Sequence, residues 1–411
     1  MLSVLEAQQR ILSHFLTIGE TISIPLEQAA GRILSVDVQA QTDLPPFDNS
    51  SVDGFAVRAA DLAASDAHVP TRLPVVADIP AGARPGLRLE PGQSARIMTG
   101  APLPAGADAV VMVEDTDFKD RGAGLAAPSN VSLYRAVKVG ENVRPQGMDL
   151  KKGQQVLPSG RPLRAQEIGM LAMLGLASVP VRRAPRLAVL STGDEILPVG
   201  AALVPGKIHD ANGYSLAALA STAGCEVIRL GVAADTRESV QQKLDAAVEA
   251  RADVILSSAG VSVGAFDYVK EVVQAGGELD FWKVNMRPGK PLAFGTYRGV
   301  PFFGLPGNPV SAFVGFLVFV EPALARLQGA PLVQRKRVRV LLGDPLESDG
   351  RESYLRASVA LEGGKYVARL SKNQSSGNLF SLVEANALLI IPSGVKSCPP
   401  ETEVDAWFLE A

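Results

Sequence analysis

The sequence has very few cysteines, histidines and aromatic residues. Its 411 residues include 2 Cys and 3 His, and 5% of them are aromatic. Cys225 and Cys398 lie far apart and in no metal-binding spacing, so we expect no disulfide and a reducing cytosol. The three histidines, His14, His68 and His209, form no nucleophile or zinc pattern. Nothing in the sequence therefore supports a Ser-His-Asp hydrolase.

The sequence also lacks a strong net charge and a long hydrophobic run. Its formal net charge is -3 and its pI is near 5.8, so any site for a polyanion must be local. The longest apolar run, residues 312–320, is far shorter than the ~20 residues of a membrane span and predicts a buried helix. The N-terminus lacks the basic start and apolar run of a signal peptide. We therefore expect a cytoplasmic protein.

The composition and hydrophobic pattern of the sequence change along the chain, which predicts several domains. Residues 3–18 fit an amphipathic helix, and residues 42–143 form short β-rich runs broken by Pro and Gly. From residue 186 strands alternate with helices, which predicts a doubly wound parallel sheet with helices on both faces. Beyond residue 334, β-branched alternation predicts a small β-barrel or sandwich. The strands expected in the α/β part are residues 187–190, 227–230, 254–256, 281–284, 292–294 and 301–303, and the helices are 213–223, 238–251, 268–274 and 310–327.

Three polar loops follow predicted strands of the α/β part. They are residues 191–195 (Ser-Thr-Gly-Asp-Glu), 257–267 (Ser-Ser-Ala-Gly-Val-Ser-Val-Gly-Ala-Phe-Asp) and 304–309 (Gly-Leu-Pro-Gly-Asn-Pro). Parallel sheets place ligands at the carboxyl ends of their strands, so these loops should converge on one crevice. Small residues before a helix suit a phosphate, although residues 257–267 alone fit an ordinary tight turn equally well.

Charged residues in and near these loops could bind Mg²⁺ and anions. Asp194, Glu195 and Asp267 could hold Mg²⁺, which needs only one or two carboxylates when phosphates complete its shell. The segment from Trp282 to Pro291 carries three cations that could neutralise an anion or could simply be solvated: Lys283, Arg287 and Lys290.

Several residues in these loops have an ordinary structural explanation. Asp235 precedes Thr-Arg-Glu in a capping-box pattern, and on the residues alone we favour helix capping. Asp267 could cap the helix expected at residue 268. Pro306 and Pro309 fit the first turn of a helix. His209 lies beside the expected crevice, but helix entry through Asp210 and Asn212 explains its segment better.

Two further polar loops flank the β-rich region. Residues 45–56 (Pro-Pro-Phe-Asp-Asn-Ser-Ser-Val-Asp-Gly-Phe-Ala) form a turn-rich loop that presents carboxylates, including Asp53. Residues 140–149 pair a cation with carboxylates where the chain leaves the region, ending at Asp149. Clefts between domains are favoured ligand sites, so both loops are candidates for binding.

Taken together, these motifs resemble the molybdopterin molybdotransferases, the family of bacterial MoeA and the E domains of gephyrin and its plant counterpart. Eight segments carry the resemblance in the family's order: PPFDNSSVDGFAVR, RIMTGAPLPAGADAVVMVED, ENVRPQGMD, STGDE, GKIHDAN, SSAGVSVGAFDYVK, WKVNMRPGKPLAFG and FFGLPGNPVSAFV. The chain departs from the common pattern at Ser51-Val52, where Ala-Met is usual, and at Phe55, where Tyr is usual. These changes preserve size and leave Asp53 in place.

The resemblance implies a multidomain arrangement and a homodimer. The domains expected from it are an N-terminal helix packed on the α/β domain (1–20), an elongated linker domain in two segments (21–47 and 149–183), a β-rich second domain (48–148), an α/β molybdopterin-binding third domain (184–330) and a C-terminal β-barrel (331–411). The active site should lie between the third domain of one subunit and the second domain of the other.

The resemblance also implies the activity and its residues. The activity is insertion of molybdate into adenylylated molybdopterin with Mg²⁺, giving molybdenum cofactor and AMP. The positions implied to be important for activity are Asp53, Thr99, Asp149, Glu195, Asp235, Asp267, Pro306 and Pro309. The expected substrate-binding residues are Ser191, Thr192, Gly193, Ser257, Ser258, Gly260, Ser262, Gly264, Lys283, Arg287, Lys290, Gly307 and Asn308.

These positions suggest a mechanism in which the Gly/Ser loop and Mg²⁺ hold the pyrophosphate. Glu195 and Asp267 would be the metal ligands or their neighbours, and the cations would offset the charge of the pterin phosphate or molybdate. Two alternatives stay open. One is a pterin adenylyltransferase or pyridine-nucleotide-processing enzyme with the same third-domain fold, and the other is a non-catalytic dimeric scaffold.

The role of Asp267 gives a direct test. Asp267→Asn should sharply reduce AMP release, because the substituted amide no longer supplies a negative charge to the metal or the reacting phosphate. AMP release is measured with adenylylated molybdopterin, and circular dichroism and gel filtration check the fold and the dimer. Turnover equal to that of the unaltered protein would exclude this role.

Overall fold

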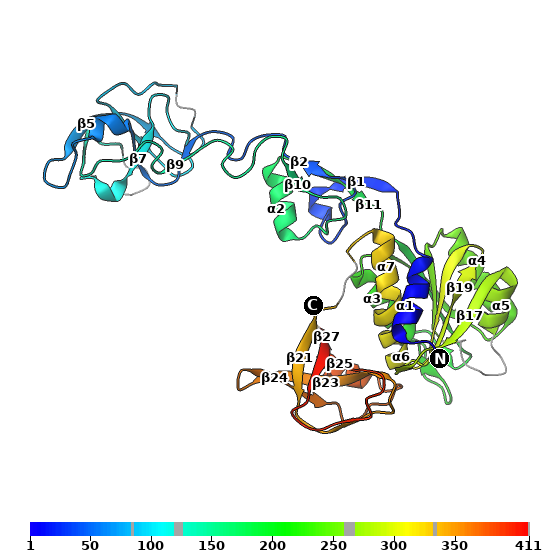
Figure 1. Ribbon diagram of the computed structural model, residues 1–411. Coiled ribbons are helices and arrows are strands. Elements are labelled where there is room, and N and C mark those ends of the chain that lie inside the picture. Colours follow the sequence, from blue (N-terminus) through cyan, green and yellow to red (C-terminus); the bar gives the residue numbers. More distant parts are fainter. Residues whose placement is uncertain (84–85, 119–125, 259–267, 332–334, 410–411) are drawn as a thin grey trace. The chain divides into compact units, whose positions relative to one another are not determined.

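The structure, a computed structural model, describes residues 1–83, 86–118, 126–258, 268–331 and 335–409. The chain divides into two compact units. Unit 1 comprises residues 1–36, 159–169 and 177–411, and unit 2 comprises residues 37–158 and 170–176. Figure 1 shows the helices and strands of both units.

A six-stranded sheet forms the centre of the α/β part of unit 1. Its order is β15 (Glu226–Ala233), β12 (Arg186–Thr192), β16 (Val254–Ser258), β20 (Val300–Leu305), β19 (Pro291–Tyr297) and β17 (Gly277–Lys283). The first four strands are parallel, as predicted, but β19 runs antiparallel to both of its neighbours. Only Arg298 and Gly299 join β19 to β20, and both have positive φ. Such a two-residue turn can form a hairpin but cannot form a parallel crossover.

Helices cover both faces of this sheet, as the alternation predicts (Figure 1). One face packs against α1, α3 and the long helix that begins with α6, in a core that includes Leu187, Phe303 and Phe319. The other face packs against α4 and α5 through residues such as Val240 and Val272. The bounds are α1 (Val4–Ser13), α3 (Asn212–Thr222), α4 (Arg237–Glu249), α5 (Tyr268–Gly276) and α6 (Pro309–Gly315).

Helix α1 packs on the α/β sheet through Val4, Ala7 and Ile11. It begins with a capping box in which Ser3 and Glu6 satisfy each other's backbone N–H groups. Just beyond the helix, the Phe15 ring stacks on Phe303 at 5.9 Å between centroids and lies 6.2 Å from Phe294. The first turns of the chain therefore complete a core formed by strands almost three hundred residues further on.

The longest apolar helix is a core helix. Residues Pro309–Gln328 run continuously through α6, a π-helical turn (Phe316–Val320) and α7 (Glu321–Gln328). This helix is long and apolar enough to cross a membrane, but 78% of its most apolar window is buried inside the fold. The prediction of a buried helix is therefore confirmed.

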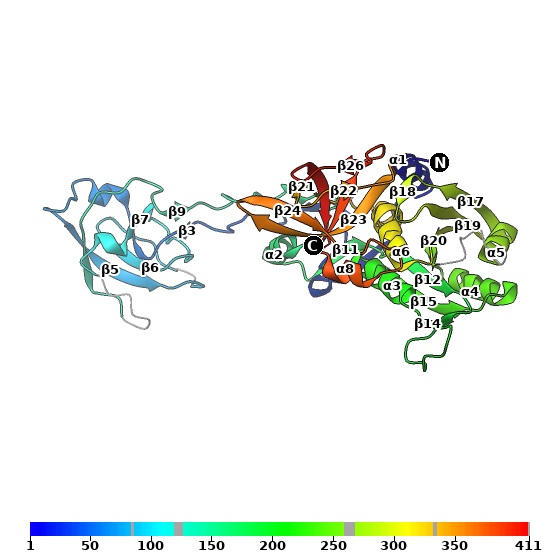
Figure 2. The same cartoon turned by 90° about the horizontal axis from the view of Figure 1, so that it is seen from below.

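The C-terminal part of unit 1 is a closed five-stranded barrel, which resolves the choice between barrel and sandwich. Strand β23 pairs with both β24 and β25, so no edge is left open. The short strand β18, in the loop between β17 and β19, pairs with β23 and joins the α/β part to the barrel (Figure 2). The bounds are β18 (Met286–Arg287), β21 (Arg337–Leu342), β22 (Leu346–Glu347), β23 (Glu352–Glu362), β24 (Lys365–Leu370), α8 (Phe380–Glu384), β25 (Ala387–Ile391), β26 (Ser397–Cys398) and β27 (Glu403–Phe408).

Unit 2 contains a five-stranded sheet with the order β7-β4-β6-β5-β8. All five strands lie within the stretch predicted to be β-rich, residues 42–143, and the core includes buried valines such as Val57, Val111 and Val131. The sheet strands are β4 (Gly54–Val57), β5 (Thr71–Ile79), β6 (Ser94–Ile97), β7 (Ala109–Met112) and β8 (Asn130–Leu133). Smaller elements of unit 2 are β2 (Val38–Gln39), β3 (Asn49–Ser50), η2 (Ala59–Leu62), η3 (Val113–Asp115), β9 (Val143–Arg144) and β10 (Gln155–Leu157).

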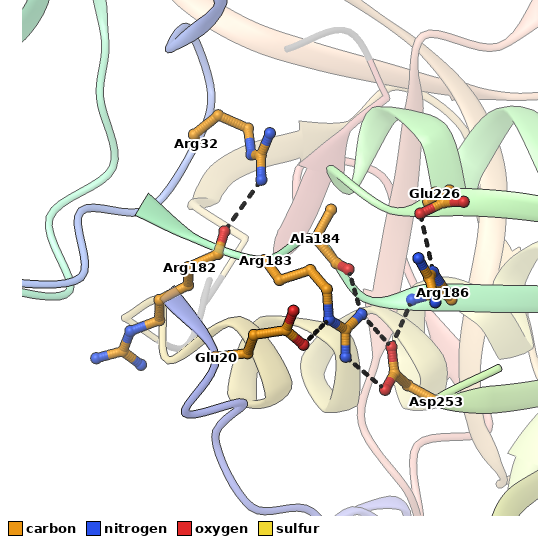
Figure 3. A network of polar contacts seen from close by, with 8 residues as sticks. All are labelled: Glu20, Arg32, Arg182, Arg183, Ala184, Arg186, Glu226 and Asp253. Carbon is orange, nitrogen blue, oxygen red and sulfur yellow. Dashed lines mark hydrogen bonds and ion pairs between the residues drawn. The ribbon is translucent and has the colours of Figure 1, made fainter. Parts of the chain in front are cut away.

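An ionic network fixes the point at which the chain enters the α/β sheet (Figure 3). Two antiparallel strands, β1 (Thr21–Pro25) and β11 (Ser178–Arg182), precede the sheet strands in the chain. The short helix η1 (Leu26–Gln28) follows β1, and helix α2 (Ala165–Met173) comes before β11. The Arg183 guanidinium donates to both carboxylate oxygens of Asp253 at 2.9 and 3.0 Å and to Glu20 at 2.7 Å. Asp253 also accepts the backbone N–H of Arg186 at 2.7 Å. One carboxylate thereby ties the starts of β12 and β16 together.

We expect Asp253→Ala to lower the free energy of unfolding by about 3 kcal/mol, because it removes three hydrogen bonds from a half-buried charge and leaves Arg183 without its main partner. Urea unfolding followed by circular dichroism measures the change. Glu226→Ala is the matched control, since the exposed Arg186–Glu226 pair is worth about 1 kcal/mol or less. Equal losses for the two variants would contradict the proposed role of Asp253.

Candidate active site

The predicted loops converge on one pocket at the carboxyl ends of β12, β16 and β20. It has a volume of about 580 Å³. The expected residues among its lining are Ser191, Thr192, Glu195, Ser258, Pro306, Gly307, Asn308 and Pro309. We call this the first pocket. Its position agrees with the rule that open α/β sheets bind ligands beyond the carboxyl ends of their strands.

The end of β12 supplies hydroxyl groups and a carboxylate to the first pocket. Ser191 and Thr192 are buried, and Ser191 Oγ lies 3.4 Å from Ser258 Oγ on the neighbouring strand. Gly193 has a φ of +139°, and a Cβ there would lie 2.5 Å from Glu195 Oε2. Only glycine therefore lets the chain turn so that the Glu195 side chain folds back beside the strand end.

Asp235 faces a second aspartate at the end of the sheet. Its backbone N–H donates to Asp194 Oδ1 at 3.0 Å, and the Asp194 N–H lies 3.4 Å from Asp235 Oδ2. Burial raises the pKa of Asp235, and the negative charges of Asp194 and Glu195 raise it further. The prediction that Asp235 caps α4 is wrong, because Thr236 is the N-cap and its hydroxyl accepts from the Ser239 N–H at 3.2 Å. Asp235 lies one residue too early for that bond.

The loop after β20 forms a second wall of the first pocket. Asn308 Nδ2 donates to Ser376 Oγ of the barrel at 3.0 Å, and Asn212 Nδ2 donates to the Gly307 carbonyl oxygen at 2.8 Å. Pro309 is the first residue of α6, as its sequence context predicts. The loop is thus held on one side by α3 and on the other by the barrel.

A segment between β12 and α3 contributes residues that the sequence did not mark as functional. It contains the short parallel strands β13 (Ile196–Leu197) and β14 (Ile208–His209). Ile196, Ile208, His209, Asp210 and Asn212 line the first pocket. Asp210 and Asn212 looked like helix-entry residues, and only the position of their motif just before a helix at this sheet edge could have marked them.

A second, basic pocket adjoins the first and shares Pro291, Pro306 and Asn308 with it. It has a volume of about 420 Å³ and lies between the α/β part and the barrel. Of the predicted cations, Arg287 and Lys290 line it, whereas the exposed Lys283 belongs to neither lining. Its other polar lining residues come from the barrel and its flanking loops: Arg351, Arg356, Gln374, Ser375 and Ser376.

Arg356 is a buried cation in the lining of the second pocket. It is only 1% exposed, and its guanidinium donates to Ser381 Oγ at 3.0 Å and to the carbonyl oxygens of Asn373 and Ser375. No carboxylate of the described residues pairs with it. Burial and the charge of Arg287 lower the pKa of Arg356 to about 10, so it remains a cation at neutral pH. A buried cation without an anionic partner is a strong site for an oxyanion.

Unit 2 carries three of the predicted residues. Asp53 Oδ1 accepts both the backbone N–H of Thr99 at 2.8 Å and its hydroxyl at 2.7 Å, so these two residues form one polar group. Asp149 accepts from Arg144 at 2.5 Å and is about half exposed. Ser257, by contrast, is buried in unit 1 beside Leu190 of the sheet. Four further predicted residues lie outside the described part of the chain: Gly260, Ser262, Gly264 and Asp267.

The separate roles of Thr236 and Asp235 can be measured. Thr236→Ala should lower the free energy of unfolding by about 1 kcal/mol, because it removes the cap of α4. Asp235→Asn should not lower it at pH 7, because a carboxylate whose folded-state pKa lies above its unfolded value of 3.8 destabilises the fold as the pH rises through that range. Urea unfolding at pH 7 and pH 4 tests both. A loss of stability in Asp235→Asn would show that Asp235 supports the helix after all.

Known proteins with the same architecture extend over the whole chain. A structure titled as a molybdopterin biosynthesis MoeA protein from Pyrococcus horikoshii superposes with a TM-score of 0.82 at 33% identity, covering 100% of each chain. A Nostoc protein named molybdopterin molybdenumtransferase is 41% identical over 91% of this chain and 86% of its own length. Molybdopterin molybdenumtransferase 2 of Mycobacterium tuberculosis is 38% identical over 98% of this chain and 99% of its own length.

Family models match three successive parts of the sequence. They are described as MoeA N-terminal region (domain I and II) for residues 2–175, probable molybdopterin binding domain for residues 188–326, and MoeA C-terminal region (domain IV) for residues 339–409. The matches on either side of the α/β part favour neither an isolated adenylyltransferase domain nor a pyridine-nucleotide-processing enzyme. The chain therefore belongs to the MoeA family, whose curated relatives are named molybdopterin molybdenumtransferase.

Proposed function

We propose that this protein inserts molybdate into adenylylated molybdopterin and releases AMP, in the cytoplasm. The observation that carries the proposal is the pair of adjoining pockets. The first pocket is lined by hydroxyls, amides and a carboxylate, and the second is basic and contains the buried Arg356. A reaction between an adenylylated pterin and an oxyanion needs two such sites within reach of each other.

In this proposal the oxyanion lies in the second pocket. Arg356 and Lys290 supply positive charge, and Ser376 supplies a hydroxyl group. Arg351 contributes less, because it is bound to Asp349 at 2.5 and 3.0 Å and to the Met286 carbonyl oxygen. Pro291, Pro306 and Asn308 form the shared wall, across which the dithiolene sulfurs of the pterin would meet the molybdenum.

The adenylylated pterin lies in the first pocket, with its pyrophosphate near the ends of β12 and β16. Thr192 and Ser258 offer hydroxyl donors to phosphate oxygens there, while the Ser191 hydroxyl beside them donates to Asp210. The loop at residues 257–267, which is described only to Ser258, would complete this phosphate site.

The first pocket suits Mg²⁺ in its donor chemistry. Glu195 offers carboxylate oxygens beside hydroxyl groups, which is a hard oxygen donor set, and Asp267 would add a second carboxylate. The described residues contain no group of three or more His, Cys, Asp or Glu side chains that could bind a metal alone, so substrate phosphates would complete the coordination. A bound Mg²⁺ would neutralise the phosphate charge. Glu195 would hold it, while the Thr192 and Ser258 hydroxyls would orient the phosphates.

We propose further that the active unit is a homodimer. A second copy would contribute Asp53, Thr99 and Asp149, the polar residues that unit 2 presents. The Asp53–Thr99 hydrogen bonds would hold this carboxylate in place to position water or the metal.

The proposal is tested by incubating the purified protein with adenylylated molybdopterin, Mg²⁺ and molybdate. AMP release should require both molybdate and Mg²⁺, and metallated cofactor should form in equal amount. AMP release that does not depend on molybdate would contradict the proposal, and chelation of Mg²⁺ with no effect would remove the metal from it.

Lys290→Ala should raise the molybdate concentration needed for half-maximal AMP release about tenfold, because an exposed cation of the second pocket is lost without disturbing the core. Arg356→Lys should raise this molybdate concentration further, since lysine cannot reproduce the several N–H donors of the planar guanidinium. The KM for adenylylated molybdopterin should change little in both variants. Arg369→Lys, in an exposed barrel pair with Glu362, is the control. Unchanged molybdate saturation in Lys290→Ala and Arg356→Lys would move the oxyanion site elsewhere.

A further inference from the structure

Asp210 is a buried carboxylate that lines the first pocket and has one oxygen without a hydrogen-bond donor in the described part of the chain. It is 4% exposed. Its Oδ1 accepts the Ser191 hydroxyl and the Gly213 N–H, both at 2.8 Å. Oδ2 has no hydrogen-bond donor among the described residues, and the carboxylate forms no ion pair within them. Gly213 makes room for this oxygen, since a Cβ there would lie 2.3 Å from Oδ2.

Asn212, which also lines the first pocket, carries a second unused acceptor. Its Nδ2 donates to the Gly307 carbonyl oxygen, which only an N–H group can satisfy, so the orientation of the amide is fixed. Its Oδ1 is buried and has no partner in the described part of the chain. Buried acceptors are nearly always hydrogen-bonded, so an acceptor without a partner on a residue that lines a pocket points to a donor on the ligand.

Together the two side chains offer acceptors and no free donor. Such a surface fits a ring edge that carries neighbouring N–H donors and penalises an edge with an acceptor in either place. The pyrimidinone edge of a pterin has this pattern in its N3–H and 2-amino groups. The corresponding edge of adenine has one amino donor beside the acceptor N1, so it fits the same surface poorly.

We propose that Asp210 and Asn212 recognise the N3–H and 2-amino edge of the pterin and thereby orient adenylylated molybdopterin in the first pocket. This inference rests on the proposed function, because it takes that molecule as the substrate. Asp210 thus has two tasks. Its Oδ1 anchors the start of α3 to β12, and its Oδ2 accepts a hydrogen bond from the edge of the pterin ring.

The test compares two rings that differ in a single group. The probes are 6-hydroxymethylpterin and 6-hydroxymethyl-lumazine, in which a carbonyl oxygen replaces the 2-amino donor, and binding is measured by calorimetry. The unaltered protein should bind the pterin about tenfold to a hundredfold more tightly, because the lumazine places an acceptor against an acceptor. Asp210→Asn keeps an oxygen for Ser191 and Gly213 but offers an N–H to the ring. This variant should therefore lose the preference for pterin, and its affinity for lumazine should stay equal or rise.

Turnover supplies a second measurement. Asp210→Asn should raise the KM for adenylylated molybdopterin about tenfold while the molybdate dependence stays unchanged. Asp245→Asn is the matched control, since Asp245 accepts the Tyr297 hydroxyl on the opposite face of the sheet, and it should keep the full preference for pterin. If Asp210→Asn does not fold, Asn212→Ser serves instead, and it should weaken pterin binding more than lumazine binding.

Three outcomes would overturn the inference. The first is equal affinity of the unaltered protein for the two rings. The second is an equal loss of affinity for both rings in Asp210→Asn. The third is an Asp210→Asn variant that loses activation by Mg²⁺ but keeps the preference for pterin. Each of these can occur while the unaltered protein still releases AMP in a molybdate-dependent way, in which case the proposed function stands. Absence of that release would overturn the proposed function itself.

Discussion

The bond between Arg183 and Asp253 sets the geometry on which the site depends. Asp253 immediately precedes β16, and Arg183 lies just before β12, so their paired charges align the starts of two adjacent strands. The strands then run in register from Leu187 opposite Val254 to Ser191 opposite Ser258. Ser191 and Ser258 therefore lie opposite each other at the carboxyl ends of β12 and β16, because Asp253 and Arg183 hold the other ends of these strands in register. Glu20, which directly precedes β1, also accepts a hydrogen bond from Arg183 and so joins β1 to the same network.

The sequence predicted the elements of unit 1 well but not all of their directions. Alternating apolar runs located every strand of the six-stranded sheet and the helices that cover it, but not the short strands β13, β14 and β18. They could not show that β19 runs antiparallel, because a short apolar strand has the same pattern in either direction. The decisive residues are Arg298 and Gly299, whose two-residue turn leaves no room for a crossover. The capping pattern was also ambiguous by one residue, and Thr236 occupies the position assigned to Asp235.

The candidate site was only partly predictable. Ser191 and Glu195, which line the first pocket, were predicted because small residues and carboxylates after a strand carry a recognisable chemistry, whereas Pro306 was predicted only from the resemblance. Arg356 was missed because an arginine within alternating barrel residues looks like any exposed strand residue until the fold buries it. Asp210 was missed for the opposite reason, since an aspartate before a helix already has a sufficient structural explanation. Distant segments that meet only after folding leave no periodic signal.

The packing of α1 against strands made much later has a consequence for how the chain is made. Residues 37–158 of unit 2 are contiguous, so they can fold while the α/β part is still being synthesised. Phe15, however, finds its partner only when Phe303 emerges, roughly 290 residues later. At about 5–20 residues per second this leaves the apolar face of α1 uncovered for about 15–60 s. During synthesis that face is exposed to chaperones and to other nascent chains, and folding of unit 1 must wait for its last strands.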